Sequence, residues 1–164
     1  MRRLSDGVET ALHCMLLLTG LDEGMVLPGK SLAEFHGVSE SYLLKHMRAL
    51  AARHLVEATP GPRGGYRLAR APAEITLLDI VEAIDGSGPA FTCREIRRRA
   101  PGASTDPCAY KADCFIKTRM LSAEAVWRDA LRRQSLADLV ADGESMIGQT
   151  NRQAIAAFLK AEQR

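Results

Sequence analysis

A glycine between two short helical patterns, followed by a hairpin rich in proline and glycine, constrains the fold of this chain most strongly. Ser31 can cap a short helix, LAEFH, and Gly37 ends it because glycine tolerates the positive φ of a sharp turn. Ser39 can cap the next helix, which is predicted to reach about His54 with one apolar face. The extended runs LVEAT and GYRLA follow, and the intervening PGPRG predicts that they form a β-hairpin.

Helix, sharp turn, helix and hairpin together predict a winged helix-turn-helix. Further helices are expected over residues 6–20, within ITLLDIVEAIDG, from Ser122 onward, after Ser135 and near the end of the chain. The fold class is therefore mainly α with a small β-hairpin wing. Cys14 lies on the apolar face of the first helix, where we expect a small core residue.

The second helix of the pair and the hairpin tip are expected to bind double-stranded DNA, because the major groove admits an α-helix. Residues 38–70 carry six Lys or Arg against two acidic residues, a surplus that suits a phosphate backbone, although solvated charged faces would give the same pattern. The side chains expected to face the duplex are Ser39, Ser41, Tyr42, Lys45, His46, Arg48 and, at the hairpin tip, Arg63.

Three of the four cysteines lie in FTCREIRRRAPGASTDPCAYKADCF, a segment with too few apolar residues to form its own core. The start of the chain imitates a signal peptide, but acidic residues interrupt it and no small-residue cleavage site follows. No apolar run approaches the ~20 residues of a membrane span. We therefore expect a cytoplasmic protein without a membrane partner, whose reduced thiols favour metal binding or redox chemistry over structural disulfides.

VSESYLLKHMRALAARHLVEATPGPRGGYRLAR, ITLLDIVEAIDG and AVWRDALRRQSLADL resemble the IscR/NsrR-type winged-helix regulators of the Rrf-two superfamily, over residues 1 to about 141. The resemblance implies a homodimeric transcription regulator whose long helices cross, with Trp127 as an anchor of the dimer core. It also implies an iron–sulfur cluster in the cysteine loop. One departure is that Pro60 replaces the arginine that usually opens the wing motif, and Arg63 lies inside the turn instead.

On this resemblance the chain divides into five segments. These are a winged helix-turn-helix DNA-binding domain (1–72), a connecting helix (73–90), a cluster-binding cysteine loop (91–119), a dimerisation helix (120–141) and a C-terminal tail (142–164). The implied function is a transcriptional regulator, expected to be a repressor, that senses redox or related stress. The operator, the regulated genes and the physiological signal do not follow from the sequence.

The candidate cluster ligands come from the resemblance to the redox-sensing RsrR branch, whose start is nearly the same string as LSDGVETALHC. The match implies two cysteines, Cys93 and Cys114, from one chain, with Glu9 and His36 from the other. Cys108 would be a spare or alternative ligand. Ligation by glutamate and histidine favours a [2Fe–2S] cluster over other types.

Other interpretations of these residues stay open. Glu9 could serve only the dipole of the first helix, and His36 could be an ordinary exposed polar residue. Zn²⁺ held by the three loop cysteines and His36 would make the site structural, although no compact C-x₂-C pair is present. A thiol-based switch is possible beside the arginines near Cys93. A thiol redox enzyme is disfavoured because no C-x-x-C or catalytic constellation occurs, so no enzyme activity and no small-molecule substrate are expected.

Overall fold

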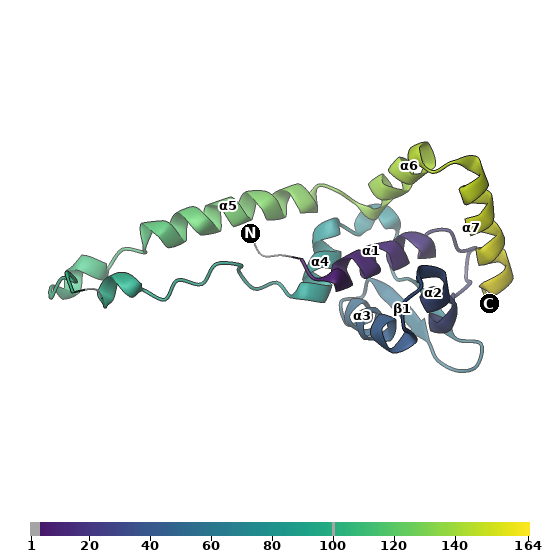
Figure 1. Ribbon diagram of the computed structural model, residues 1–164, viewed down its shortest axis with the longest axis horizontal. Helices are drawn as coiled ribbons and strands as arrows, with labels where there is room; N and C mark the ends of the chain where they lie inside the picture. The colour runs from purple at the N-terminus through teal and green to yellow at the C-terminus, as the bar shows by residue number, and fades with distance from the viewer. Residues whose placement is uncertain (1–3, 100) are drawn as a thin grey trace.

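The computed structural model describes residues 4–99 and 101–164, which form a compact head and a long arm (Figure 1). The first part of the head contains three helices and a hairpin: α1 (Asp6–Leu18), α2 (Gly29–His36), α3 (Glu40–Ala52), β1 (Val56–Thr59) and β2 (Gly65–Leu68). It is completed by a 3-10 turn and three more helices: η1 (Pro72–Glu74), α4 (Leu77–Asp85), α6 (Leu136–Met146) and α7 (Gln149–Glu162). The arm consists of α5 (Phe115–Arg132) and the segment that leads to it, with η2 (Ile96–Arg98) and η3 (Pro107–Tyr110). The predicted winged helix-turn-helix class is confirmed.

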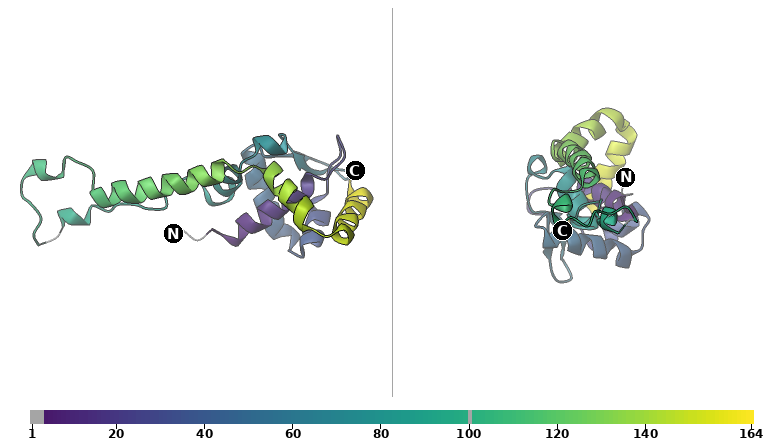
Figure 2. Two further views of the ribbon diagram at one scale, coloured as in Figure 1. Left: turned by 90° about the horizontal axis from the view of Figure 1, so that it is seen from above. Right: turned by 90° about the vertical axis from the view of Figure 1, so that its left-hand side faces the viewer.

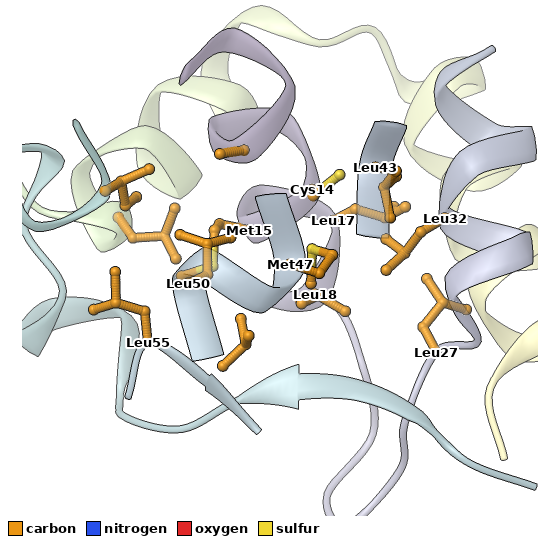
Figure 3. Packing of buried hydrophobic residues seen from close by; sticks show 14 of the residues in the cluster. Cys14, Met15, Leu17, Leu18, Leu27, Leu32, Leu43, Met47, Leu50 and Leu55 are labelled. Carbon is orange, nitrogen blue, oxygen red and sulfur yellow. The ribbon is translucent and has the colours of Figure 1, made fainter. Parts of the chain in front are cut away.

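The core of the head lies between α1, α2, α3 and the hairpin (Figure 3). Cys14 is buried there as a small apolar residue, as the sequence predicts. The largest fully buried side chains of the core include Met15, Leu27, Leu32, Leu43, Met47, Leu50 and Leu55. Truncating one such leucine to alanine typically lowers the free energy of unfolding by about 2–5 kcal/mol. Because residues of α1 and α3 share this core, it holds the two helices together.

The turn between α2 and α3 has the predicted geometry. Gly37 has φ 64°, in the left-handed region where glycine carries no steric penalty. The Ser39 hydroxyl accepts a hydrogen bond from the backbone N–H of Tyr42 at 3.3 Å, which caps α3. The predicted cap at Ser31 is wrong, because α2 already begins at Gly29 after Pro28 and Ser31 lies buried inside the helix.

The hairpin forms the wing, with Val56 paired to Leu68 and Thr59 to Gly65. PGPRG makes the tip, where Gly61 has φ 100°. Leu27 lies beside the second strand and exchanges two backbone hydrogen bonds with Tyr66, each 2.9 Å long. The wing is thus tied to the loop between α1 and α2.

The arm leaves the head beside α4 and carries the cysteine segment to its far end (Figures 1 and 2). The 18 residues of α5 span about 27 Å at 1.5 Å per residue. The helix begins at Phe115 rather than at the predicted Ser122, because Cys114 adopts the extended N-cap conformation just before it. At the base of the arm, Glu82 of α4 accepts hydrogen bonds from Arg128 of α5 and from Arg53 at the end of α3.

After the arm the chain returns to the head. Ser135 caps α6 in a reciprocal capping box with Asp138. Leu136 is fully buried, and its backbone N–H donates to the carbonyl of Ile75 at 2.8 Å. α7 then packs along the head near the wing (Figure 1). No helix within the described ranges is long and apolar enough to cross a membrane.

Candidate nucleic-acid interface and cluster site

The amino-terminal half of α3 presents polar side chains to solvent. Gly37 turns the chain so that α3 projects from the head with its capped end accessible. The predicted DNA-facing residues that are exposed on α3 and its cap are Ser39, Ser41, Tyr42, Lys45 and Arg48, and the acidic Glu40 is exposed beside them. The predicted residues offer hydroxyl, phenol and cationic donors, the groups that bind base edges and phosphates. Arg63 at the wing tip is also exposed.

The expectation that His46 is exposed on α3 is wrong. Only 8% of His46 is accessible, because the ring points toward α1 and lies against the backbone of Gly7. A Cβ added to Gly7 would lie 2.9 Å from Nδ1 of His46, so only glycine admits the ring. Tyr42 packs on the ring edge-on, with 4.6 Å between centroids. His46 therefore joins the two helices and is not available to a base edge in this arrangement.

Two histidines and a glutamate lie near one another on the head. Glu9 and His13 are one turn apart on α1, and both are exposed. His36, at the end of α2, lies 6.0 Å from His13 between ring centroids. Sequence analysis missed His13, although its spacing of four residues from Glu9 on a predicted helix would have revealed it.

His36 has a ring nitrogen that no protein group in the described part of the chain satisfies. Its Nε2 atom is buried and has no hydrogen-bond partner among the described residues. Burial lowers the pKa of His36, and the neighbouring His13 lowers it further, so the ring is neutral at pH 7. A neutral imidazole nitrogen without a partner is the form that binds metals.

The cysteine segment at the far end of the arm brings two of its three thiols together. Cys93 lies near enough to Cys114 to contribute to the lowered pKa of that thiol, whereas Cys108 is exposed. The backbone N–H groups of Lys117 and Ile116 lower the pKa of the Cys114 thiol, while burial opposes them. The preference for these two cysteines over Cys108 as cluster ligands stays a prediction.

Arginines, rather than an apolar core, organise this loop. Arg97 bonds to the carboxylate of Glu95 and to the carbonyl of Ala112, both at 2.8 Å. Arg98 donates to the carbonyl of Tyr110 at 3.2 Å, and both guanidinium groups lie over the tyrosine ring. The segment is held around its cysteines by hydrogen bonds and cation–π contacts.

A single chain does not bring the candidate ligands together. Within the residues that the structure describes, no three His, Cys, Asp or Glu side chains form a group that could hold a metal ion. The paired cysteines lie at the end of the arm, while Glu9, His13 and His36 lie on the head (Figure 1). The chain therefore presents two separate sets of donors.

Comparison with known proteins identifies the family. The family model Rrf2, described as an iron-dependent transcriptional regulator, matches residues 4–142. The putative transcriptional regulator YwgB of Bacillus subtilis is 31% identical over 134 residues, covering 82% of this chain and 81% of that protein. The regulator NsrR of Geobacillus kaustophilus is 28% identical, covering 88% of this chain and 93% of its own.

Solved structures with the same fold include two named regulators. IscR of T. potens superimposes with a TM-score of 0.64 at 25% identity, covering 92% of this chain and 96% of that one. CymR, the global cysteine regulator of B. subtilis, gives a TM-score of 0.61 at 25% identity, covering 86% of this chain and 98% of CymR. These relatives are transcriptional regulators and not enzymes. The narrower resemblance to the RsrR branch stays a prediction. The chain belongs to the Rrf2 family of winged-helix transcriptional regulators.

Proposed function

We propose that this chain is a homodimeric DNA-binding repressor that responds to redox state through an iron–sulfur cluster of the [2Fe–2S] type held between two subunits. The observation that carries the proposal is the separation of two donor sets, paired thiols on the arm and a carboxylate with imidazoles on the head. The description of the family as iron-dependent supports it.

The donor sets fit such a cluster. Thiolates are the preferred ligands of iron–sulfur clusters, and imidazole can replace cysteine on one iron. Cys93 and Cys114 would come from one subunit, and Glu9 and His36 from the other. His13 is an alternative imidazole, because it lies on the same helix face as Glu9. Cys108 has no role in this set.

A second copy of the chain is the partner that would bring the two sets together. The amino-terminal half of α5 exposes apolar side chains, with Phe115 73% accessible, that its own chain does not cover. Trp127 lines an apolar cavity of about 640 Å³ between α4 and α5, together with Leu78 and Val81. Burial of these surfaces against another α5 would stabilise a dimer in which each arm reaches the partner's head.

The head couples its donor set to the DNA-reading helix in two ways. His36 is the last residue of α2, and only Gly37, Val38 and the cap separate it from α3. The Gly7–His46 contact joins the start of α1 to the middle of α3. When bound, the cluster would supply a one-electron change in charge at the dimer interface. A shift of His36 or α1 would then move Ser41 and Lys45 relative to the duplex.

The test is anaerobic purification followed by iron and sulfide determination and DNA binding at one fixed salt concentration. We expect bound iron and sulfide, with different DNA affinities for the oxidised, reduced and cluster-free protein. Cys93→Ser and Cys114→Ser should abolish iron binding, whereas the matched control Cys108→Ser should retain it. Equal affinity in all three states would show that the cluster does not control DNA binding.

A thiol-based switch without a cluster is the second candidate, and the proximity of Cys93 to Cys114 favours it. Two thiols in contact can form a disulfide when an oxidant removes two electrons and two protons. In that case the anaerobic protein would be colourless, and oxidant would change its DNA affinity. A zinc site using all three loop cysteines is less well supported, because Cys108 lies apart from the other two.

A further inference from the structure

The end of the chain packs against the DNA-binding part of the head. The Rrf2 match ends at residue 142, so α7 lies beyond it. Leu159 of α7 is buried against Gly20, where a Cβ would come within 2.6 Å of a leucine methyl group. Phe158 packs against Phe35 of α2 with 4.8 Å between the ring centroids and the rings tilted by 49°. α7 is therefore part of the folded head.

Hydrogen bonds fix the residues after α7 beside the wing. Arg164 exchanges two backbone hydrogen bonds with Val26, each 2.9 Å long. The next residue, Leu27, exchanges two more with Tyr66 of β2. The Ser31 hydroxyl of α2 donates to the carboxylate of Glu162 at 2.6 Å. The end of the chain, the loop before α2 and the wing are thus joined by backbone pairing.

This pairing brings a second guanidinium to the wing tip. Arg164 donates from Nη1 to the carbonyl of Pro62 at 2.8 Å, next to the exposed Arg63. Within the described residues neither guanidinium forms an ion pair with a carboxylate. Each guanidinium has five N–H donors, so Arg164 keeps free donors after binding Pro62.

We infer that Arg164 and Arg63 together form a phosphate-binding pair at the wing tip, which contacts the DNA backbone beside the groove read by α3. The inference rests on the DNA binding in the proposed function but not on the cluster. The wing motif of this chain opens with Pro60 instead of the usual arginine. Arg164 would supply the cation that this replacement removes. Two guanidinium groups on one wing tip suit the phosphate backbone because each can donate two parallel hydrogen bonds to phosphate oxygens.

The salt dependence of DNA binding tests this inference. Binding to a mixed-sequence duplex would be measured between about 50 and 200 mM salt for the wild type, Arg164→Gln and Arg63→Gln, all at equal iron content. Because the proposed dimer carries each residue twice, each substitution should make the slope of log affinity against log salt shallower by about 1.8 and lower the affinity roughly 25- to 100-fold at 0.1 M salt. The control is Arg152→Gln at the other end of α7, where the side chain donates to the carbonyl of Glu144. It should leave the slope unchanged.

An unchanged slope in Arg164→Gln overturns the inference. Lower DNA affinity with the wild-type slope also overturns it. In that case Arg164 would stabilise the wing turn through its hydrogen bond to Pro62 without contacting a phosphate. Equal melting temperatures for Arg164→Gln and Arg152→Gln exclude an effect of unfolding. If the wild type contains no iron but the slope still falls in Arg164→Gln, the sensing proposal fails and this inference stands.

Discussion

The contact between Gly7 and His46 gives the sharpest prediction about the head, because it is the point where α1 meets α3, the helix that we propose reads DNA. The His46 ring lies on the glycine backbone, and a Cβ at position 7 would be 2.9 Å from Nδ1 and 3.0 Å from Nε2. Gly7→Ala must therefore push the ring, or α3 with it, away from α1. Overpacking of this kind costs about 1–3 kcal/mol.

A double-mutant cycle separates this clash from the helix propensity of alanine. Replacing glycine by alanine within a helix stabilises by up to about 1 kcal/mol, so Gly7→Ala alone should lower the free energy of unfolding by about 0–3 kcal/mol. In a His46→Ala background the clash is gone, and the same change should stabilise by up to about 1 kcal/mol. The coupling energy between the two positions is then about 1–3 kcal/mol.

Urea unfolding of the wild type, both single variants and the double variant measures this coupling. Gly143→Ala serves as the control, since a Cβ there meets only the Ile147 side chain at 3.5 Å and no ring. It should be neutral or stabilising in either background. If Gly7→Ala changes stability equally with and without His46, the two residues do not contact each other and the coupling between α1 and α3 must lie elsewhere.

Three further predictions concern stability. Burial lowers the pKa of His46 below its ordinary value of 6.5, so the unfolded chain binds more protons. The free energy of unfolding should fall as pH drops from 6.5 toward the folded pKa, and His46→Ala should flatten this dependence in urea titrations. Glu82→Gln should lower the free energy of unfolding by about 1–2 kcal/mol, because it weakens the hydrogen bonds from Arg53 and Arg128 at the base of the arm. Leu159→Ala should lower the free energy of unfolding by about 2–5 kcal/mol in calorimetry, because Leu159 is buried. If α7 lay outside the core, the substitution would have little effect.

Local signals in the sequence were sufficient for the helix-turn-helix and the wing. Gly37 and Ser39 act through their own backbone conformation and a neighbouring N–H, so their roles can be predicted without knowing the fold. PGPRG likewise defines its hairpin within five residues. The exposed positions of α3 followed from its apolar periodicity.

The errors arose where distant parts of the chain meet. His46 has a polar side chain, and only the glycine on α1 explains why it is buried. Ser31 is an acceptable cap by sequence, but Pro28 starts the helix earlier and leaves the hydroxyl to bind Glu162. The position of α7 depends on buried leucine and backbone pairing that no local pattern encodes.

The candidate ligands were predicted from a resemblance, and the geometry supports some choices more than others. The proximity of Cys93 to Cys114 supports that pair, and the Nε2 atom without a partner among the described residues supports His36. The spacing of His13 from Glu9 is visible in the sequence, but its contact with His36 depends on the packing of α1 beside α2. Ligands from two chains cannot be recognised from spacing in one sequence, because the distance between them is set by a dimer.

Subunit complementation tests most directly whether each site combines the arm of one chain with the head of the other. One variant carries Cys93→Ser and Cys114→Ser, and the second carries Glu9→Ala with both His13→Ala and His36→Ala. Each homodimer should contain no iron. A purified heterodimer of the two should recover about half of the wild-type iron, since it contains one complete site of the two. A heterodimer as empty as its parents, beside a wild type that binds iron, would contradict a site shared between subunits.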